Sequence, residues 1–310
     1  MKAYHDVHIH NYLSSCSNDS GATVERYIEG ARQLGLKLMG FANHTWDESI
    51  PFPAPSGFYS RQSMAFQMQI KAQIPQDVPG IKVLVGAETE YCGMYDVLGM
   101  GKEAAEQLDF LLIPHTHVHM RGFVMPANPD FAVARRALAE RLSTAEGITP
   151  EYAALLASKA PEDSLEPFMP AERFDFVGFT ADFMVKSLRS LLENETLNSY
   201  ADRLPVSVAH PFQPVNFGKL RHAMLERISS NTFGELFETV AARGIGLEIN
   251  PHTGNDDDFR MFSVAKECGC KFTLGSDMHT RAEAPDIFKT EVLTARLGLT
   301  EYDLMDFVRV

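Results

Sequence analysis

The sequence lacks several features that would place it in familiar classes of protein. Its 310 residues include only four cysteines, irregularly spaced, which excludes a disulfide framework. No apolar run approaches the roughly 20 residues that a membrane span requires. The first residues, MKAYHDVHIH, show no apolar stretch behind a basic start, so no secretory signal is expected. We therefore expect a soluble, cytoplasmic protein with no membrane partner.

Basic residues are also scarce. Only 28 Lys and Arg stand against 41 Asp and Glu, a formal net charge of −13. Proteins that bind long nucleic acids usually present a basic face, so no such partner is expected. With 45% hydrophobic residues, the chain has an ordinary globular composition and can bury a substantial core. The oligomeric state stays open.

Short, β-rich apolar runs recur between amphipathic helical patterns. Most of these runs are continuously apolar, which is typical of strands buried on both faces. The seven predicted strands are Ala3–His10, Lys37–Asn43, Ile81–Glu90, Phe110–His115, Pro205–Ala209, Ile245–Asn250 and Lys271–Ser276. Their alternation with helices predicts an α/β fold, a TIM-like barrel more than an open sheet. No glycine-rich dinucleotide fingerprint follows the first strand, which argues against a Rossmann domain.

The spacing of these strands is uneven. About 90 residues separate the fourth predicted strand from the fifth, and they carry three helical patterns. We therefore predict one domain over residues 1–310, with a helical insertion at about residues 120–200.

The positions of the histidines carry the strongest functional signal. In a parallel barrel the C-terminal ends of the strands converge on one face, where active sites form. The histidines at or just after such an end are His8, His10, His44, His115, His117, His210, His252 and His279. Residues far apart in the sequence are thus expected to meet in one pocket.

Three local patterns among these residues suit metal ions. Alternation along a strand places His8 and His10 on the same side, where they can hold one cation together. Glu88 ends the third strand, and its carboxylate can bridge two cations. Asp277 and His279 repeat the two-residue spacing after the last strand. Each pattern is weak alone, but together they predict a metal cluster.

A series of motifs, in order along the chain, resembles the PHP (polymerase and histidinol phosphatase) superfamily. These motifs are Asp6-Val7-His8-Ile9-His10, Asn43-His44, Gly86-Ala87-Glu88, Asp109-Phe110-Leu111-Leu112-Ile113 leading to a histidine, Ala209-His210-Pro211, Glu248-Ile249-Asn250 and Gly275-Ser276-Asp277-Met278-His279. The resemblance implies a distorted barrel of seven βα units that holds two or three Zn, Mn or Fe ions. It is specific for the fold and the metal site, and much less so for the substrate.

The resemblance also implies how the ligands divide among the ions. The ligands of one ion would be His8, His10, Glu88 and Asp277. Those of a second ion, bridged by Glu88, would be a histidine of the fourth strand and His210. Those of a third would be His44 and His279. For the fourth strand we favour His117, with His115 next, and we expect His119 to line the substrate pocket or to have no role.

Two positions depart from the family pattern. The family usually carries an Asp where Asn43 precedes His44. It often supplies another His or Asp shortly after the first histidine pair, where this chain reads Ser14-Ser15-Cys16-Ser17-Asn18-Asp19. Cys16 or Asp19 could serve there, or the third ion could be weak or absent.

Some of the other polar residues near strand ends are candidates for substrate binding, and the rest are expected to have no part in the reaction. The candidates for contact with a substrate phosphate are Arg121, His252, Arg260, Arg281 and His119. Asp256-Asp257-Asp258 is expected as a solvated helix start, because acidic residues suit a helix N-terminus. His5 and His222 are expected on the surface or on a helix face.

These residues support the hypothesis of a metal-dependent phosphoric ester hydrolase. Its substrate would be a small phosphorylated metabolite, as for a histidinol phosphate phosphatase, attacked by a hydroxide that bridges the cations. Asp277, Glu88 and His279 are the predicted catalytic residues. The alternatives are a phosphodiesterase or exonuclease of the same fold and a non-catalytic metal-binding regulatory module. A carbonyl hydrolase of the amidohydrolase kind ranks lower, because no predicted strand ends in a suitable lysine.

Overall fold

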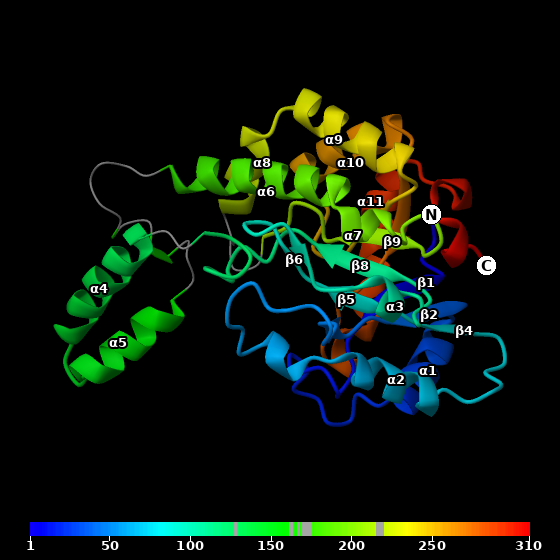
Figure 1. Ribbon diagram of the computed structural model, residues 1–310, viewed down its shortest axis with the longest axis horizontal. Coiled ribbons are helices and arrows are strands. Elements are labelled where there is room, and N and C mark those ends of the chain that lie inside the picture. The colour runs from blue at the N-terminus through cyan, green and yellow to red at the C-terminus, as the bar shows by residue number, and fades with distance from the viewer. Residues whose placement is uncertain (127–128, 161–163, 166–167, 169–174, 215–219) are drawn as a thin grey trace.

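The computed structural model describes the chain apart from residues 127–128, 161–163, 166–167, 169–174 and 215–219. It is a mixed α/β structure in which helices flank parallel strands (Figure 1). Every predicted strand range contains a strand. These strands are β1 (His5–Ile9), β2 (Leu38–Phe41), β4 (Lys82–Val85) followed by β5 (Ala87–Thr89), β8 (Leu111–Pro114), β9 (Val206–Ala209), β10 (Gly246–Ile249) and β11 (Lys271–Leu274).

The strands are arranged in two parallel sheets and one hairpin. One sheet has the order β1-β2-β4 and the other the order β11-β10-β9-β8-β5-β3, where β3 (His44–Thr45) follows shortly after β2. A parallel bridge between Ile9 and Met278 connects the end of β1 to the segment after β11. The antiparallel pair β6 (Tyr91–Cys92) and β7 (Val97–Leu98) was not predicted from the sequence. Because the sheet strands run parallel, their carboxyl ends share one side of the molecule.

The interior is packed so closely that some positions accept only glycine. Phe110 is fully buried just before β8. A Cβ atom at Gly86 would lie 2.6 Å from the ring of Phe110, and one at Gly40 would lie 2.8 Å from it. Any larger residue at either position would displace this ring from the core. The two glycines therefore allow Phe110 to pack against β2 and the junction of β4 and β5.

Helices cover the sheets from two sides. Helices α1 (Val24–Leu34) and α2 (Met64–Gln73) lie on one side, and α8 (Leu220–Arg227), α9 (Ser230–Ala242) and α10 (Asp256–Glu267) lie on the other (Figure 1). Helix α1 shows why this sequence is helical: Thr23 caps its first turn, and Gly35 ends it with a φ of 75°. Its buried residues recur at helical spacing: Val24, Tyr27, Ile28 and Ala31. Shorter helices are α3 (Lys102–Ala105) and α11 (Thr290–Arg296).

The long segment between β8 and β9 is helical where it is described. It contains α4 (Pro129–Ser143), α5 (Pro150–Lys159), α6 (Phe176–Glu193) and the short α7 (Glu195–Asn198), one helix more than predicted. Helices α4 and α5 lie side by side, away from the sheets, whereas α6 lies along α8 (Figure 1). The Arg135 guanidinium joins the pair by donating to the carbonyl oxygens of Ala157, Ser158 and Ala160. Within the described parts of the chain, no helix has the length and apolar character to cross a bilayer.

Candidate metal centre

Among the residues that the structure describes, three neighbouring groups of side chains could each hold a metal ion at the carboxyl ends of the strands. The members of group one are His8, His10, Glu88 and Asp277. The members of group two are Glu88, His117 and His210. The members of group three are His10, Cys16, His44 and His279. Within each group the potential ligand atoms lie within 4.8 Å of one another. The structure thus brings together the sets that the resemblance implied, and it places Cys16, one of the two alternatives for the third ion, with His10 in group three.

Group one is built from the end of β1, from β5 and from the loop after β11. The Nε2 atoms of His8 and His10 both lie 3.4 Å from Glu88 Oε2. They lie 3.4 Å and 3.2 Å, respectively, from Asp277 Oδ1. His8 Nε2 and Glu88 Oε2 are buried and make no hydrogen bond among the described residues. Buried polar atoms are rarely left without partners, so two that converge on one point fit a bound cation.

Glu88 is the residue that groups one and two share. It lies in β5, where it pairs with His44 of β3 on one side and with Leu112 of β8 on the other. Its Oε2 faces group one, and its Oε1 lies 3.0 Å from His210 Nε2 and 3.8 Å from His117 Nε2. A carboxylate with one oxygen toward each group can bridge two cations.

The far ring nitrogen of three of these histidines has a buried partner. His8 Nδ1 donates to Glu248 Oε2 at 2.7 Å, and His117 Nδ1 donates to Glu90 Oε2 at 2.7 Å. His210 Nδ1 is hydrogen-bonded to Thr116 Oγ1 at 2.6 Å. Such partners orient a metal-binding imidazole and leave its Nε2 lone pair free for the ion.

The environments of His117 and His115 decide which of the two could bind a metal ion. His115 is fully buried, its Nδ1 donates to the Met184 carbonyl at 3.2 Å, and its Nε2 accepts the Phe212 amide at 3.2 Å. Burial lowers the pKa of His115 to about 3, so the ring stays neutral. With both nitrogens in use, His115 belongs to no candidate group among the described residues, whereas His117 belongs to group two. The placement thus favours His117 as the fourth-strand ligand.

The charges in this cluster depend on one another. Burial opposes the ionisation of Glu88, but the charges of His44 and His8 hold the pKa of its carboxyl well below the usual range. The pKa of Asp277 is likewise depressed, since the charge of His8 and a hydrogen bond with His10 outweigh its burial. Buried Glu88 and partly buried Asp277 therefore stay ionised only beside positive charge. Protons on the imidazoles supply that charge here, and divalent cations could supply it instead.

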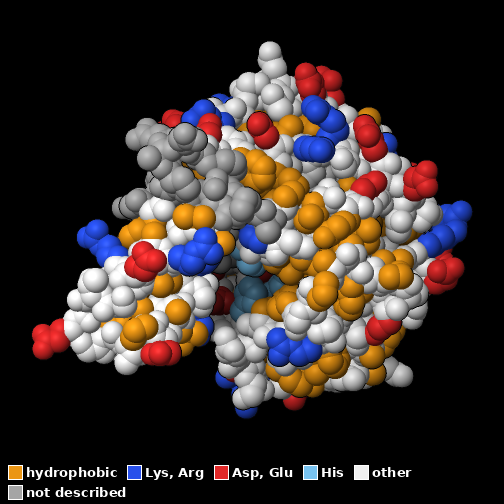
Figure 2. Space-filling view, turned by 60° about the vertical axis from the view of Figure 1, so that its left-hand side comes forward, with side chains coloured by type: hydrophobic (Ala, Val, Ile, Leu, Met, Phe, Trp, Pro, Cys, Tyr) orange, Lys and Arg blue, Asp and Glu red, His pale blue; other side chains and the backbone are white. Residues whose placement is uncertain are grey.

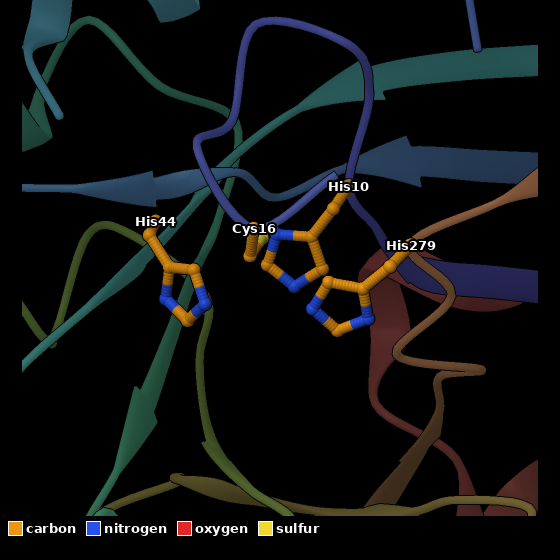
Figure 3. A group of neighbouring side chains, drawn as sticks. All are labelled: His10, Cys16, His44 and His279. Atoms are coloured by element: carbon orange, nitrogen blue, oxygen red, sulfur yellow. The ribbon is translucent and has the colours of Figure 1, made fainter. Parts of the chain in front are cut away.

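Group three contains a cysteine and three histidines (Figure 3). The rings of His10 and His279 are stacked, with centroids 4.6 Å apart. Burial raises the pKa of the Cys16 thiol, but His10 outweighs this through its charge, and hydrogen bonds from nearby histidines help to lower the value to about 3. Burial lowers the pKa of His279, but its hydrogen bond with Cys16 and the charge of Asp277 raise it to about 9. Of the alternatives Cys16 and Asp19, only Cys16 lies in this group.

The backbone at the site is strained and tightly packed. His210 and Asp277 have positive φ angles, 29° and 53°, which non-glycine residues rarely adopt. Such strain costs about 1–3 kcal/mol per residue and clusters at functional sites. A Cβ atom at Gly275 would lie 2.5 Å from His8 Cβ and 2.6 Å from Glu248 Oε2. Glycine at this position therefore lets the end of β11 approach β1.

A cavity of about 670 Å³ opens above the candidate ligands. Figure 2 shows histidine side chains at the bottom of a hollow in the surface. Its lining combines cluster residues with Phe58, His119, Met120, Gln213, Pro214, Arg221, Asn250 and His252. His119 is exposed at the cavity beside His117, with ring centroids 5.6 Å apart. Two of the five predicted substrate-binding residues, His119 and His252, thus face the cavity.

The three predicted arginines lie outside the described lining of this cavity. The Arg260 guanidinium donates to the carbonyl oxygens of Leu225 and Ile228 beside α8. Arg281 forms an ion pair with Asp19 at 2.8 Å. Arg121 contacts the Met125 sulfur and lies over the ring of Phe176. Their proximity to strand ends in the sequence did not bring these guanidinium groups into the pocket.

Arg221 is the arginine that does line the cavity. It lies on α8, and its guanidinium pairs with the buried carboxylate of Asp258 and donates to the His252 carbonyl at 3.0 Å. The acidic run Asp256-Asp257-Asp258 was expected as a solvated helix start. Asp256 does begin α10, but Asp257 is 8% exposed and Asp258 is fully buried. The expectation of solvation was wrong for these two residues because α8 packs over them.

The prediction for His5 was also wrong. Its side chain is buried, 1% exposed, and its Nε2 accepts the Leu274 amide at 2.8 Å. Burial lowers the pKa of His5 to about 3. His222, by contrast, lies exposed on α8 and pairs with Asp257 and Glu226. His5 is therefore part of the connection between β1 and β11.

Sequence reasoning missed Arg221 and the supporting carboxylates Glu90 and Glu248. Glu248 had a signal, since it lies in one of the family-like motifs and in a buried strand. Glu90 lies two residues after Glu88, a spacing that could have been noticed. Nothing local distinguishes Arg221 from other helix-surface arginines.

Fold and site together define a mixed α/β protein with a candidate centre for divalent metals. No protein-family model matches the chain, and no curated protein matches it either. Among solved structures, the histidinol phosphate phosphatase from Lactococcus lactis subsp. lactis Il1403, complexed with zinc, L-histidinol and phosphate, is similar at a TM-score of 0.53. The two are 15% identical, over 96% of this chain and 94% of that chain. This likeness shows that the two chains share a fold.

Two further structures show weaker likeness. An archaeal ribonuclease P with mature tRNA contains a chain with a TM-score of 0.36 and 10% identity, over 94% of this chain and 90% of that one. The catalytic domain of a β-amylase from Paenibacillus polymyxa has a TM-score of 0.33 and 11% identity, over 95% and 99%. At these scores neither likeness carries an argument.

Proposed function

We propose that this protein is a metal-dependent phosphoesterase that hydrolyses a small phosphomonoester in the cavity above the three groups. The observation that carries the proposal is Glu88, whose two oxygens face two adjacent sets of histidines at the bottom of an open pocket. The similar Lactococcus lactis structure, which holds zinc and phosphate, supports it. Because all three groups are intact, a non-catalytic module is the poorer interpretation.

The proposal includes the closure of the strands into one barrel of seven βα units, with residues of about 120–200 as an insertion. The parallel bridge from Ile9 to Met278 supports this closure, as does the hydrogen bond from the His10 amide to the Met278 carbonyl at 3.0 Å. Closure in this manner brings Asp277 and His279 beside the histidines that follow β1.

Bound cations, of Zn, Mn or Fe, would supply two kinds of chemistry: they lower the pKa of water and neutralise the oxygens of the phosphate. In this proposal the catalytic residues are Asp277, Glu88 and His279. Asp277, which is held ionised, accepts a hydrogen bond from the attacking water. Glu88 would help to hold the cations of groups one and two, and His279 lines the cavity beside Cys16.

Arg221 takes the role that the sequence had suggested for other arginines. It is fixed by Asp258, so its remaining donors can face the cavity without a large loss of side-chain entropy. Its Nε is buried and makes no hydrogen bond among the described residues. We propose that Arg221 binds the phosphate, while His119, with His252, contacts the rest of the substrate. Phe58, Met120 and Pro214 provide apolar contacts.

The first test is hydrolysis of a panel of phosphomonoesters, histidinol phosphate included, with added Zn or Mn. Chelation should abolish turnover, and Asp277→Ala should lower kcat at least about 100-fold because it removes a ligand and an acceptor. Arg221→Lys keeps the pair with Asp258 but loses the planar fork, so KM should rise about tenfold. Arg189→Ala, in an exposed pair with Glu235, is the matched control and should leave both constants unchanged.

One outcome would overturn the proposal. Metal-loaded protein that hydrolyses none of the monoesters is not a phosphomonoesterase, and turnover of diesters by that protein would favour the phosphodiesterase alternative.

A further inference from the structure

Group three differs from the other two groups in its donor atoms. Groups one and two combine imidazoles with carboxylates, whereas group three offers three imidazoles and the Cys16 thiol (Figure 3). The side chain of His10 is fully buried, and its Nδ1 makes no hydrogen bond among the described residues. His44 Nδ1 is likewise buried without a hydrogen bond, although it lies 2.9 Å from Glu88 Oε2. His44 Nδ1 thus has an ion-pair partner in Glu88, whereas the buried Nδ1 of His10 has none among the described residues and points to a missing ligand.

The loop that carries Cys16 is attached to the segment that carries His279. The Ser17 hydroxyl donates to the His279 carbonyl at 2.7 Å. Two residues further on, Asp19 accepts hydrogen bonds from the backbone amide and the guanidinium of Arg281. Both connections lie just after Cys16 in its loop, and they join that loop to His279 and to the residue two positions after it. The sulfur is therefore held in place by the chain around it, as a ligand must be.

His10 also belongs to group one, where its Nε2 lies 3.2 Å from Asp277 Oδ1. If His10 binds the cation of group one, then Cys16, His44 and His279 remain for a third cation. Thiolate is a soft ligand that favours Zn²⁺, whereas carboxylate and water suit Mn²⁺. The donor set of group three is thus chemically unlike that of its neighbours.

We propose that Cys16 is a thiolate ligand of a third metal site, with His44 and His279, and that this site selects zinc over manganese. The inference rests on the proposed function only in that the groups bind cations. It goes beyond that function by assigning one ion of the cluster a different ligand chemistry and a different metal preference.

The test is titration of the metal-free, full-length protein with Co²⁺, a spectroscopic substitute for zinc. Binding of cobalt by a thiolate produces a sulfur-to-metal charge-transfer absorption in the near ultraviolet, and imidazole or carboxylate ligands do not produce it. We expect this band in the unmodified protein and its loss in both Cys16→Ser and Cys16→His. Cys268→Ser is the matched control, since this partly buried cysteine lies far from the site beside Gly234, and it should retain the band.

Metal content provides a second, independent readout. After dialysis against equal Zn²⁺ and Mn²⁺, the unmodified protein should retain zinc in the third site, and Cys16→Ser should lose one equivalent of zinc. Cys16→His should retain a third ion while its preference for zinc falls. Circular dichroism checks that each variant is folded. If Cys16→Ser does not fold, Cys16→His still provides the test.

The outcomes separate this inference from the proposed function. Cobalt that binds at full stoichiometry without the band, or a band that survives in Cys16→His, would overturn the role of Cys16. Failure to bind cobalt at all would overturn it too. The band without any phosphatase activity would support the thiolate site while it removes the phosphoesterase proposal.

Discussion

At the scale of single residues, the environment decides what each histidine can do. His8 and His115 both lie fully buried at strand ends. The pKa of His8 is raised well above its ordinary value, because the carboxylates of Glu248, Asp277 and Glu88 outweigh its burial. His115 faces a carbonyl and an amide instead, and burial lowers its pKa to about 3. One residue type thus gives a candidate ligand in one case and a neutral core residue in the other.

His5 provides a pH-dependent prediction at this scale. Burial lowers its pKa to about 3, so between pH 3 and 6.5 the unfolded chain binds a proton that the folded chain does not. The free energy of unfolding therefore rises with pH across this window, and stability is lost as the pH falls below 6.5. Because of His5 alone, the free energy of unfolding should be about 1.4 kcal/mol lower at pH 5.5 than at pH 7.5.

His5→Gln retains an acceptor for the Leu274 amide but cannot titrate. The free energy of unfolding is measured with urea, in the presence of a chelator, at pH 7.5 and at pH 5.5. Its decrease between these two pH values should be smaller in the variant than in the unmodified protein by about 1.4 kcal/mol. Equal decreases in both proteins would mean that His5 is not held neutral by burial.

At the scale of elements, the strands and the loops after them divide the work. The strands supply Glu88 and Glu248 from rigid, buried positions. The turns that follow β9 and β11 supply His210 and Asp277, both with positive φ. A backbone held in this region costs about 1–3 kcal/mol and persists only where the surrounding packing enforces it. The strained positions therefore depend on close packing between neighbouring strands.

Gly275 gives a prediction about that packing. An alanine there would place its Cβ atom 2.5 Å from His8 Cβ and 2.6 Å from Glu248 Oε2, so the carboxylate that orients His8 must move. We expect Gly275→Ala to weaken zinc binding at group one by about tenfold or more, as seen when such supporting groups are lost. Calorimetric titration of the metal-free variant and of the metal-free unmodified protein with zinc measures the two affinities.

Gly30→Ala is the control for that prediction. Gly30 lies within α1, and nothing surrounds its Cβ position within 4 Å. Alanine should therefore leave zinc binding unchanged and stabilise the helix by up to about 1 kcal/mol. Equal zinc affinity in Gly275→Ala and Gly30→Ala would contradict the role given to Gly275.

At the scale of the whole molecule, the acidic chain concentrates buried carboxylates and imidazoles at one end of its parallel strands. The net charge is −13, yet buried Glu88 and partly buried Asp277 stay ionised because positive charge surrounds them. A cation that binds the folded chain but not the unfolded chain would stabilise the folded state. At a concentration of 1,000 times its Kd, each bound ion adds about 4 kcal/mol to the free energy of unfolding.

Metal removal should therefore lower the thermal midpoint by several degrees, since about 1 kcal/mol shifts the Tm of a chain this large by roughly 2–4 °C. Differential scanning calorimetry with excess zinc, and then with a chelator, measures the shift. His8→Ala lacks a ligand of group one and should show a smaller shift. A Tm that zinc leaves unchanged in the unmodified protein would argue against a resident metal.

Much of the fold could be predicted from the sequence because its signals are local. Each of the seven apolar runs contains a strand, since continuous burial imposes the same pattern on any parallel strand. The helical character of the segment between β8 and β9 was also predicted. The short α7 and the hairpin of β6 and β7 were missed, because elements of two to four residues show no periodicity.

The sequence by itself determined which residue types stand at the ends of the strands, and so which residues could form the cluster. Only the tertiary structure decided which of them meet. Arg221 of α8 faces the cavity because Asp258 of α10 holds it there, and His115 is excluded because Met184 and Phe212 occupy its nitrogens. These partners are separated by 37, 69 and 97 positions along the chain. Local patterns fix element type, but the contacts of a side chain depend on how distant elements pack.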